Sequence, residues 1–590
     1  MAMPDRARQA GTRVSGAEIL VDALREEGVS LLFGYPGGMV IPIFDVLNRC
    51  DDIDLVLTRH EQAAIHAADG YARATGKVGV CLVTSGPGAT NTITGIATAK
   101  LDSIPLVVIS GQVRTTVIGS DAFQETDMVG LTRPICKHNY LVQTIEDLPA
   151  SLKNAFHIAR TGRPGPVSVD LPVDVAEATL KDYSYPTSVH LPGYSPTLKG
   201  NHRQVIRLAQ AISEAKRPLI CAGGGVISSE ASAELLAFME KTNIPAVVTL
   251  MGLGVVPSDH PLFLGMPGMH GCAAANFALA ECDLLIGMGT RFDDRVTSCR
   301  DSFAKNARVA HIDIDPSEIG KNVKADIPVV GDVRGVISDL IAVVKPKSAG
   351  EWVGRTLKRK EANGLEFDQA KSPEILPQFV IRTISRLVKS NAVFVTDVGQ
   401  HQMWSALHLY HGRPRSFISS GGLGTMGFGL PAAMGAALAS PGRQVVCISG
   451  DGSIQMNIQE LATCAINRIP VKIVVLNNSY LGLVRQWQEL FWDKNYAKTC
   501  LRQGPDCPKK CCGPGADCPE KYLPDFVKVA QANGVEGLRA EKPCEVESVL
   551  RRGLESQGPV LMEFMVRRLE NVYPMVPSGK PITEIITRGV

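Results

Sequence analysis

Two polar segments in the C-terminal third of the chain each follow an apolar run and could together hold a divalent cation. Gly450-Asp451-Gly452-Ser453 follows residues 444–449, and Asn477-Asn478 follows residues 471–476. Parallel strands joined by a right-handed helical crossover end at one sheet edge, where open α/β sheets bind ligands. Asp451 and Asn478 are therefore expected to meet there. One carboxylate with neutral oxygens suits Mg²⁺, and glycines let the backbone approach phosphates.

Short apolar runs alternate with helix-length segments along the whole chain. Runs such as 78–83, 106–110 and 167–171 are mostly apolar, which is typical of strands buried on both faces of a parallel sheet. A chain of 590 residues is also too long for one core. The stretches 183–202 and 345–374 lack this rhythm, and we interpret both as linkers. The sequence thus predicts an α/β protein with three doubly wound parallel-sheet domains, at 1–185, 200–345 and 370–590.

Composition and charge exclude several classes of protein. Apolar residues make up 45% of the chain and charged residues 20%, and 61 Lys+Arg balance 59 Asp+Glu, so neither disorder nor nucleic-acid binding is expected. The polar head, Met1 to Val14, has neither the apolar core of a secretory signal nor the length of a transit peptide. We therefore expect a cytoplasmic protein that does not bind a membrane.

The spacing of Gly450-Asp451-Gly452 and Asn477-Asn478 resembles the thiamine-diphosphate motif. Asp451 and Asn478 would then be the magnesium ligands, with the Tyr480 carbonyl as a third. Further segments extend the resemblance across nearly the whole chain to the acetohydroxyacid synthases, the large catalytic subunits of acetolactate synthase. They are Phe33 to Gly38, Arg59 to Gln62, Ser110 to Val113, Asp121 to Glu125, Arg291 to Arg295, Asp397 to Trp404, Gly421 to Pro431, and Gln486-Trp487.

The resemblance implies an enzyme that decarboxylates pyruvate on thiamine diphosphate. The two-carbon unit would pass to a second 2-keto acid, pyruvate or 2-ketobutyrate, in branched-chain amino acid biosynthesis. Glu61 would bind the aminopyrimidine ring of the cofactor. Around the rest of the cofactor, the family positions are Val398, Gly399, Gln400, His401, Gly424, Met426, Gly450, Asp451, Gly452, Ser453 and Asn478.

The resemblance also implies substrate-contacting residues. Arg295 would pair with the carboxylate of the second substrate, a task that suits a planar guanidinium, and Trp487 would face its alkyl group. The alternatives are an Arg295 that pairs structurally with Asp293 or Asp294, and an ordinary core or interface tryptophan. Gly38 would donate a backbone N–H, Phe123 and Gln124 would line the pocket, and Val398 would limit room for the first keto acid.

The middle of the chain resembles the part of the family that binds FAD. Three expected strands of this part end in residues that can admit a dinucleotide. Glycines follow the run 219–222, the Arg291 motif follows 284–287, and acids end the run 309–314. In the family this flavin is structural. A degenerate nucleotide domain that binds nothing is the alternative. The matching positions are Arg163, Gly223, Gly224, Gly225, Met269, His270, Arg291, Asp313, Glu318 and Asp332.

Two features depart from the family pattern. Val173 stands where the family usually has a lysine. The insertion Cys500 to Cys518 carries cysteines without paired metal-ligand spacing. It is either a solvated loop or a redox-sensitive or metal-stiffened cap.

Rival activities are a flavin-dependent pyruvate oxidase and another thiamine-diphosphate carboligase. The family further implies a homodimer or homotetramer with active sites between subunits, and a small regulatory subunit as a possible partner.

Overall fold

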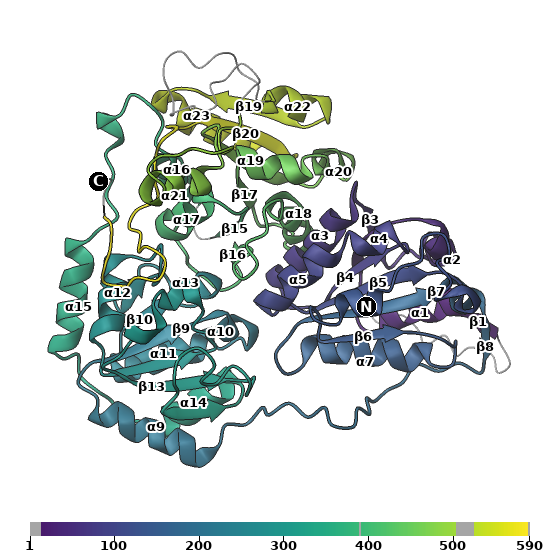
Figure 1. Cartoon of the computed structure of the whole chain (residues 1–590), viewed down its shortest axis with the longest axis horizontal. Helices are drawn as coiled ribbons and strands as arrows, with labels where there is room; N and C mark the ends of the chain where they lie inside the picture. The colour runs from purple at the N-terminus through teal and green to yellow at the C-terminus, as the bar shows by residue number, and fades with distance from the viewer. Residues whose placement is uncertain (1–12, 389–390, 503–523, 588–590) are drawn as a thin grey trace. The chain divides into compact units, whose positions relative to one another are not determined.

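The structure, a computed structural model, describes residues 13–388, 391–502 and 524–587. The chain divides into two compact units, residues 1–195 and 196–590. The first unit holds one six-stranded sheet and the second holds two, and every strand pair within these three sheets is parallel. Helices cover the sheets (Figure 1). This confirms the predicted fold class of three doubly wound α/β domains.

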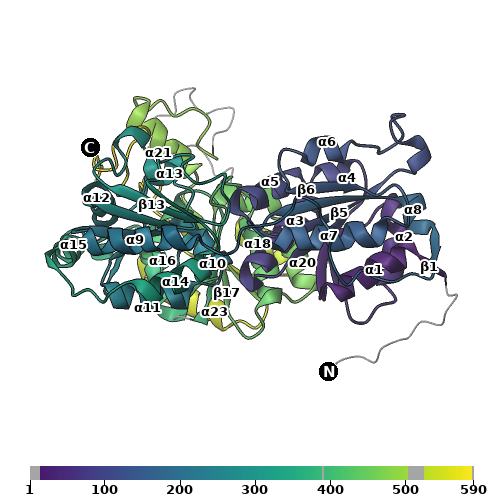
Figure 2. The same cartoon turned by 90° about the horizontal axis from the view of Figure 1, so that it is seen from below.

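The sheet of the first unit has the strand order β3-β2-β4-β5-β7-β6. The chain moves outward from β2 to β3 and then returns to the other side of β2 with β4, so the winding direction changes between β2 and β4. Figure 2 shows α4 and α6 on one side of β5 and β6 and α1 and α2 on the other. The strands are β2 (Leu31–Tyr35), β3 (Asp54–Leu57), β4 (Gly79–Val83), β5 (Leu106–Gln112), β6 (His138–Leu141) and β7 (Pro166–Pro172), and a separate antiparallel pair joins β1 (Arg13–Ser15) to β8 (Thr179–Lys181). The helices are α1 (Gly16–Glu26), α2 (Ile41–Leu47), α3 (Glu61–Thr75), α4 (Pro87–Thr90), α5 (Ile93–Asp102), α6 (Met128–Thr132), α7 (Leu148–Arg160) and α8 (Val173–Glu177).

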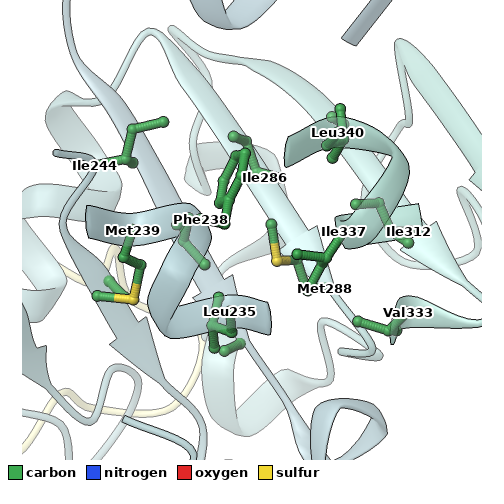
Figure 3. Packing of buried hydrophobic residues seen from close by; sticks show 14 of the residues in the cluster. Leu235, Phe238, Met239, Ile244, Ile286, Met288, Ile312, Val333, Ile337 and Leu340 are labelled. Atoms are coloured by element: carbon green, nitrogen blue, oxygen red, sulfur yellow. The ribbon is translucent and has the colours of Figure 1, made fainter. Parts of the chain in front are cut away.

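The central sheet has the order β11-β10-β9-β12-β13-β14, so its winding direction changes between β9 and β12. Successive residues of a buried strand face opposite layers, and one layer of this core joins α11 and α14 to the strands. In Figure 3, Phe238 of α11 and Ile337 of α14 lie close to Ile286 of β12. The strands are β9 (Pro218–Ala222), β10 (Ala246–Val248), β11 (Phe263–Gly265), β12 (Leu284–Met288), β13 (Arg308–Asp313) and β14 (Ile327–Val330). The helices are α9 (His202–Glu214), α10 (Gly224–Ser228), α11 (Ser232–Thr242), α12 (Ala273–Glu281), α13 (Asp294–Thr297), α14 (Val333–Val343) and α15 (Glu351–Ala362).

The C-terminal sheet has the order β16-β15-β17-β18-β20-β19, and its winding direction changes between β15 and β17. Its apolar core includes residues of β17, β18 and β20 together with α16, α17 and α23. The strands are β15 (Val393–Thr396), β16 (Phe417–Ile418), β17 (Val445–Gly450), β18 (Val471–Asn477), β19 (Glu536–Ala540) and β20 (Val560–Met565). The helices are α16 (Pro377–Val388), α17 (Gln400–His408), α18 (Gly429–Ala439), α19 (Asp451–Ile454), α20 (Glu460–Ile466), α21 (Gly482–Phe491), α22 (Phe526–Ala532) and α23 (Val546–Glu555).

The charged stretch 345–374 is not the simple linker that its sequence indicates. It contains α15, and the buried Trp352 of this helix donates from Nε1 to the Pro218 carbonyl at 2.9 Å. Trp352 and Val353 are buried, and Lys360 Nζ donates to the Phe263 carbonyl at 2.6 Å. The other residues of the helix are mostly polar, and this polarity concealed the helix from the sequence pattern.

None of the helices in the described ranges is long and apolar enough to cross a membrane. The limits of the three predicted domains stay a prediction, because the two compact units do not separate the central and C-terminal sheets.

Candidate active site

Asp451 and Asn478 leave neighbouring strands at the same edge of the C-terminal sheet. β17 and β18 are parallel, and Gly450 lies opposite Leu476. Asp451 comes directly after Gly450, and Asn478 comes two residues after Leu476, so both predicted magnesium ligands emerge at this edge. The Asp451 side chain is 1% exposed, and its Oδ2 has no hydrogen-bond partner among the described residues. Burial raises the pKa of Asp451 to about 7. A buried carboxylate oxygen left without a donor is costly, and a hard cation would satisfy it. The site therefore fits Mg²⁺.

The glycines beside Asp451 are required by close packing. A Cβ atom at Gly450 would stand 2.9 Å from His401 Nδ1, and one at Gly452 would stand 2.8 Å from Leu481 Cδ2. Met426 lies on the same side, with its Cε 3.8 Å from the Cβ position of Gly452. The turn after β17 thus brings bare backbone to the sheet edge, where a side chain would collide with His401 or Leu481.

The segment after β15 reaches the same edge, beside the point where the winding direction changes. Ser453 Oγ donates to the Val398 carbonyl at 3.0 Å, and Gly424, with φ of 70°, places its Cβ position 3.9 Å from Val398 Cγ1. His401 is buried, which lowers its pKa to about 3, so the ring is neutral. Ligands of open α/β sheets bind at such switch points. The structure therefore gathers the predicted residues of the C-terminal domain around one site.

Asp397 also belongs to this site, although the sequence marks it only as the first residue of the segment Asp397 to Trp404. Its Oδ1 accepts hydrogen bonds from the backbone N–H groups of Val398 at 2.9 Å and Gly427 at 2.8 Å. It thereby ties the turn after β15 to the turn that precedes α18. Its position as an acid at a strand end was the signal that could have identified it.

Arg295 and Trp487, predicted as substrate residues on separate domains, lie together in the second unit. The Arg295 guanidinium carbon is 6.0 Å from the centre of the Trp487 ring, and Arg295 NH1 is 3.2 Å from Met269 Sδ. The alternative of a structural ion pair is present only as a 3.5 Å contact with Asp294, in which both side chains are more than half exposed. Such a pair contributes little, so Arg295 is available to a ligand.

Apart from Arg163, which belongs to the first unit, the predicted flavin residues lie in the second unit, and several are at the carboxyl edge of the central sheet. The neighbouring strands β9, β12 and β13 end at this edge, and the winding direction changes between β9 and β12. Gly223 follows β9, Arg291 follows β12, and Asp313 is the last residue of β13. The backbone N–H of Met269 donates to the Arg295 carbonyl at 2.8 Å, which joins this edge to the substrate residues. The edge thus has the location of a dinucleotide site.

Several flavin positions also have structural roles of their own. A Cβ at Gly223 or Gly225 would overlap the backbone of Gly289, at 2.3 Å and 2.6 Å, so these glycines are needed for packing whether or not a ligand binds. Asp332 caps α14 by accepting from the Arg334 N–H at 3.0 Å. The remaining positions are Gly224, which starts α10, His270, which is buried and has a pKa lowered to about 4, and Glu318, which pairs with Lys321 at 3.0 Å.

In the first unit, Glu61 begins α3 at the edge where β2, β3 and β4 end. Asn91 Nδ2 donates to Glu61 Oε2 at 3.0 Å, and a Cβ at Gly88 would stand 3.5 Å from Glu61 Oε1. Gly38 follows β2, the strand between β3 and β4. Asn91, which sequence reasoning missed, fixes one oxygen of the predicted catalytic carboxylate. The Gly86-Pro87-Gly88 turn marked its vicinity but not its role.

Phe123 and Gln124 occupy an exposed turn of the first unit. The Phe123 side chain is 85% exposed, and Gln124 has a φ of 61°, a left-handed conformation that is rare for residues other than glycine. The carboxylate of Glu125 holds the turn by accepting from the Ala122 N–H at 2.9 Å. The pocket roles of Phe123 and Gln124 stay predictions.

Arg163, a predicted flavin residue, lies in the same unit and donates to Ser103 Oγ at 2.8 Å. Its flavin role stays a prediction.

The two departures from the family pattern lie in different places. Val173 is buried as the first residue of α8. Cys500 is a free thiol whose backbone pairs with that of Tyr480. The remaining cysteines of the insertion, at 507, 511, 512 and 518, lie outside the described residues.

Three family models cover most of the chain. They describe the thiamine pyrophosphate enzyme's N-terminal TPP binding domain at residues 14–131, its central domain at 205–340 and its C-terminal TPP binding domain at 397–564. The chain is 46% identical to the acetolactate synthase large subunit of Haemophilus influenzae, over 97% of this chain and 98% of that protein. The chain belongs to the acetolactate synthase family.

Other members of the family are equally similar. The acetolactate synthase isozyme 3 large subunit of Escherichia coli is 47% identical over 97% of this chain and 98% of its own length, and the probable large subunit of Methanocaldococcus jannaschii is 46% identical over 97% and 95%. The suspected resemblance is thus confirmed, and the chain is a thiamine-diphosphate-dependent enzyme of the acetolactate synthase type.

Proposed function

We propose that this chain carries out the family reaction with its own residues in the roles described below. It decarboxylates pyruvate and transfers the two-carbon unit to pyruvate or 2-ketobutyrate, in branched-chain amino acid biosynthesis. The supporting observation is the buried, partly unpartnered Asp451 carboxylate at the switch point of the C-terminal sheet, in a chain that matches the family along nearly its full length. The direct test is formation of 2-acetolactate from pyruvate alone and of 2-aceto-2-hydroxybutyrate after addition of 2-ketobutyrate.

Thiamine diphosphate, when bound, supplies the electron sink that loss of carbon dioxide requires. We propose that Glu61 holds a proton at the aminopyrimidine and that Asn91 orients its carboxylate through the 3.0 Å hydrogen bond. The Gly38 N–H, Phe123, Gln124 and Val398 would shape the space for the first keto acid. These roles rest on the family resemblance.

The acceptor keto acid is proposed to bind against the Arg295–Trp487 pair. Arg295 lies 6.0 Å from the indole ring and has one weak, exposed ion pair, so its guanidinium can take a carboxylate in two parallel hydrogen bonds. Trp487 then faces the alkyl end of the same molecule. The pairing favours carboligation over the oxidation of pyruvate, since a second keto acid has a binding group here.

We propose that Mg²⁺ binds Asp451, Asn478 and the Tyr480 carbonyl. The unpartnered Asp451 oxygen and the proximity of the three residues support this. Titration of the metal-free protein with Mg²⁺ in the presence of thiamine diphosphate tests it, and Asp451→Asn should remove the response.

FAD is proposed to bind at the carboxyl edge of the central sheet. The clustering of Gly223, Arg291 and Asp313 at a switch point supports a dinucleotide there, although packing alone also explains Gly223. The absorbance spectrum of the purified protein tests for a flavin. Bleaching of that flavin by pyruvate at the turnover rate would favour the rival pyruvate oxidase, and an unchanged spectrum during turnover would favour acetolactate synthesis.

The proposed assembly is a homodimer or homotetramer with active sites between subunits. The relatives named above are large subunits, so a small regulatory subunit is proposed as a partner. Analytical ultracentrifugation of the full chain tests the first proposal. Co-purification with the matching small subunit, and its effect on turnover in the presence of valine, tests the second.

A further inference from the structure

A chain of buried amide side chains runs from Asn478 to the last part of the second unit. Asn478 Nδ2 donates to Gln400 Oε1 at 3.2 Å, and Gln400 Nε2 donates to Gln486 Oε1 at 3.0 Å. Gln486 pairs with the backbone of Val572 in both directions, since its Nε2 donates to the carbonyl at 3.0 Å and its Oε1 accepts from the N–H at 2.8 Å. All three amide side chains are buried, and Gln486 is 0% exposed. We call Asn478, Gln400 and Gln486 the amide relay.

Backbone groups of fixed polarity determine the direction of every amide in the relay. The Val572 carbonyl can only accept and its N–H can only donate, so Gln486 has one satisfactory orientation. Gln400 Nε2 also donates to the Glu570 carbonyl at 2.9 Å, which leaves its oxygen for Asn478. At the far end, the Tyr480 N–H donates to Asn478 Oδ1 at 3.0 Å. The Asn478 oxygen therefore points away from Gln400 and keeps a lone pair for another partner.

Helix α21 holds the backbone that anchors the relay. Arg485 NH2 donates to the Glu570 carbonyl at 3.1 Å and also to Asn571 Oδ1, and Asn571 Nδ2 donates to Glu489 Oε1 at 3.1 Å. Arg485 is completely buried. In this water-poor interior an unpaired amide is costly, so the anchored end of the relay resists rotation.

Gly482, the first residue of α21, shows how closely the relay is packed. A Cβ there would stand 2.1 Å from Gln400 Oε1 and 2.8 Å from Asn478 Nδ2. Neither amide can rotate toward the helix without meeting its backbone.

We propose that Gln486 is a positioning residue that acts through Gln400 to hold the Asn478 amide oxygen toward the magnesium site. The inference rests on the proposed function, which supplies the metal role of Asn478. A rotated Asn478 would present its NH₂ group, a donor, to a cation. Groups that orient a metal ligand without touching the metal typically change metal affinity by about 10–100-fold when they are removed.

The test compares Gln486→Leu with Gln378→Leu in the full-length protein. Gln378 is the control, because it is also a buried glutamine and donates to the Glu570 side chain at 3.0 Å, whereas the relay uses only the Glu570 backbone carbonyl. The metal-free proteins are titrated with Mg²⁺ at a fixed concentration of thiamine diphosphate, and binding is followed by calorimetry. We expect the dissociation constant for Mg²⁺ to rise about 10–100-fold in Gln486→Leu and to stay near the wild-type value in Gln378→Leu.

Gly482→Ala provides a second variant that leaves Gln486 in place. Alanine is the better helix former, so helix propensity alone predicts a fold at least as stable as the wild type. The added Cβ, however, overpacks a buried site and displaces Gln400, so we expect weaker Mg²⁺ binding together with a lower melting temperature. Unchanged Mg²⁺ affinity in both Gln486→Leu and Gly482→Ala, or an equal loss in Gln378→Leu, would overturn the inference.

Wild-type turnover separates this inference from the proposed function. A wild-type protein that binds Mg²⁺ but forms no acetolactate contradicts the proposed function and leaves the affinity comparison intact. A wild-type protein that forms acetolactate while the three variants bind Mg²⁺ equally well contradicts only the relay. For Gln486→Leu we also expect added Mg²⁺ to restore much of kcat, since a positioning residue acts on affinity.

Discussion

Replacing Glu61 by Gln, and separately replacing its hydrogen-bond partner Asn91 by Ala, measures how the first unit contributes to catalysis. Glu61→Gln keeps the size of the side chain but removes the carboxylate that the proposed role needs. A group that transfers or holds a proton typically contributes about 10²–10⁴-fold to the rate. We therefore expect kcat for acetolactate formation to fall by that order.

The expected effect of Asn91→Ala follows from one contact. Asn91 Nδ2 donates to Glu61 Oε2 at 3.0 Å, and a hydrogen bond to a charged group is worth about 1.5–3 kcal/mol. At about 1.4 kcal/mol for each factor of ten, its loss corresponds to a decrease of about 10–100-fold if it acts fully in the transition state. Asn91→Ala should thus be clearly less severe than Glu61→Gln.

The assay is acetolactate formed from pyruvate at saturating thiamine diphosphate and Mg²⁺, with cofactor affinity measured separately. Asn139→Ala is the matched control, because Asn139 Nδ2 donates to the Val129 carbonyl at 2.9 Å in the same unit and away from Glu61. Wild-type turnover in Glu61→Gln would refute the assigned role. A loss in Asn139→Ala equal to that in Asn91→Ala would show that the effect comes from the fold and not from the carboxylate.

Three further changes test other parts of the molecule. Arg295→Gln should lower kcat/KM for the acceptor by about 10–100-fold when the concentration of 2-ketobutyrate is varied. This factor corresponds to the loss of a charged hydrogen bond of about 1.5–3 kcal/mol. An unchanged kcat/KM would contradict carboxylate binding by Arg295. Trp487→Leu should reduce the preference for 2-ketobutyrate over pyruvate, an effect on the order of 1–3 kcal/mol per methylene, and the ratio of the two products from mixed substrates measures it. Asp170 is buried beside Ser110, and burial raises its pKa from 3.8 to about 7. The native state then keeps a proton that the unfolded state releases, so this group's stabilising contribution is present below about pH 4 and is lost as the pH rises toward 7. Asp170→Asn should remove that loss, which amounts to at most about 4 kcal/mol in the free energy of unfolding. The melting temperature near pH 8, measured by calorimetry, should therefore rise. A melting temperature that depends on pH in the same way as that of the wild type would contradict the prediction.

Most of the sheet framework could be predicted from local sequence. The runs 471–476 and 106–110 became β18 and β5, each extended by one or two residues, because a strand buried on both faces is mostly apolar. Helix α15 could not be predicted in this way. It docks through Trp352 on a carbonyl of β9 and through Lys360 on a carbonyl of β11, and contacts between residues far apart in the chain leave no local periodicity.

The proposed metal site was also predicted from the sequence, but its supporting contacts were not. Gly450-Asp451-Gly452 and Asn477-Asn478 mark strand ends by their residue types, and parallel pairing requires neighbouring ends to share an edge. Asp397, Asn91 and Gln486 are an ordinary acid and two ordinary amides in the sequence. Their roles depend on the groups that face them, which are backbone N–H groups for Asp397 and Gln486 and the Glu61 carboxylate for Asn91. These groups belong to distant segments.

The sequence by itself determined the fold class and the family, because strand burial and the family's motifs leave their pattern in consecutive residues; the cofactor-binding residues that it indicates stay a prediction. Only the tertiary structure decided that Asp451 has an oxygen without a donor, that Arg295 lies against Trp487, and that the Asn478 amide points in one direction. Hydrogen bonds and burial join residues by their distance in space, and that distance is set by the packing of whole elements. For this reason the orientation of the predicted magnesium ligand follows from Val572, a residue 94 positions farther along the chain.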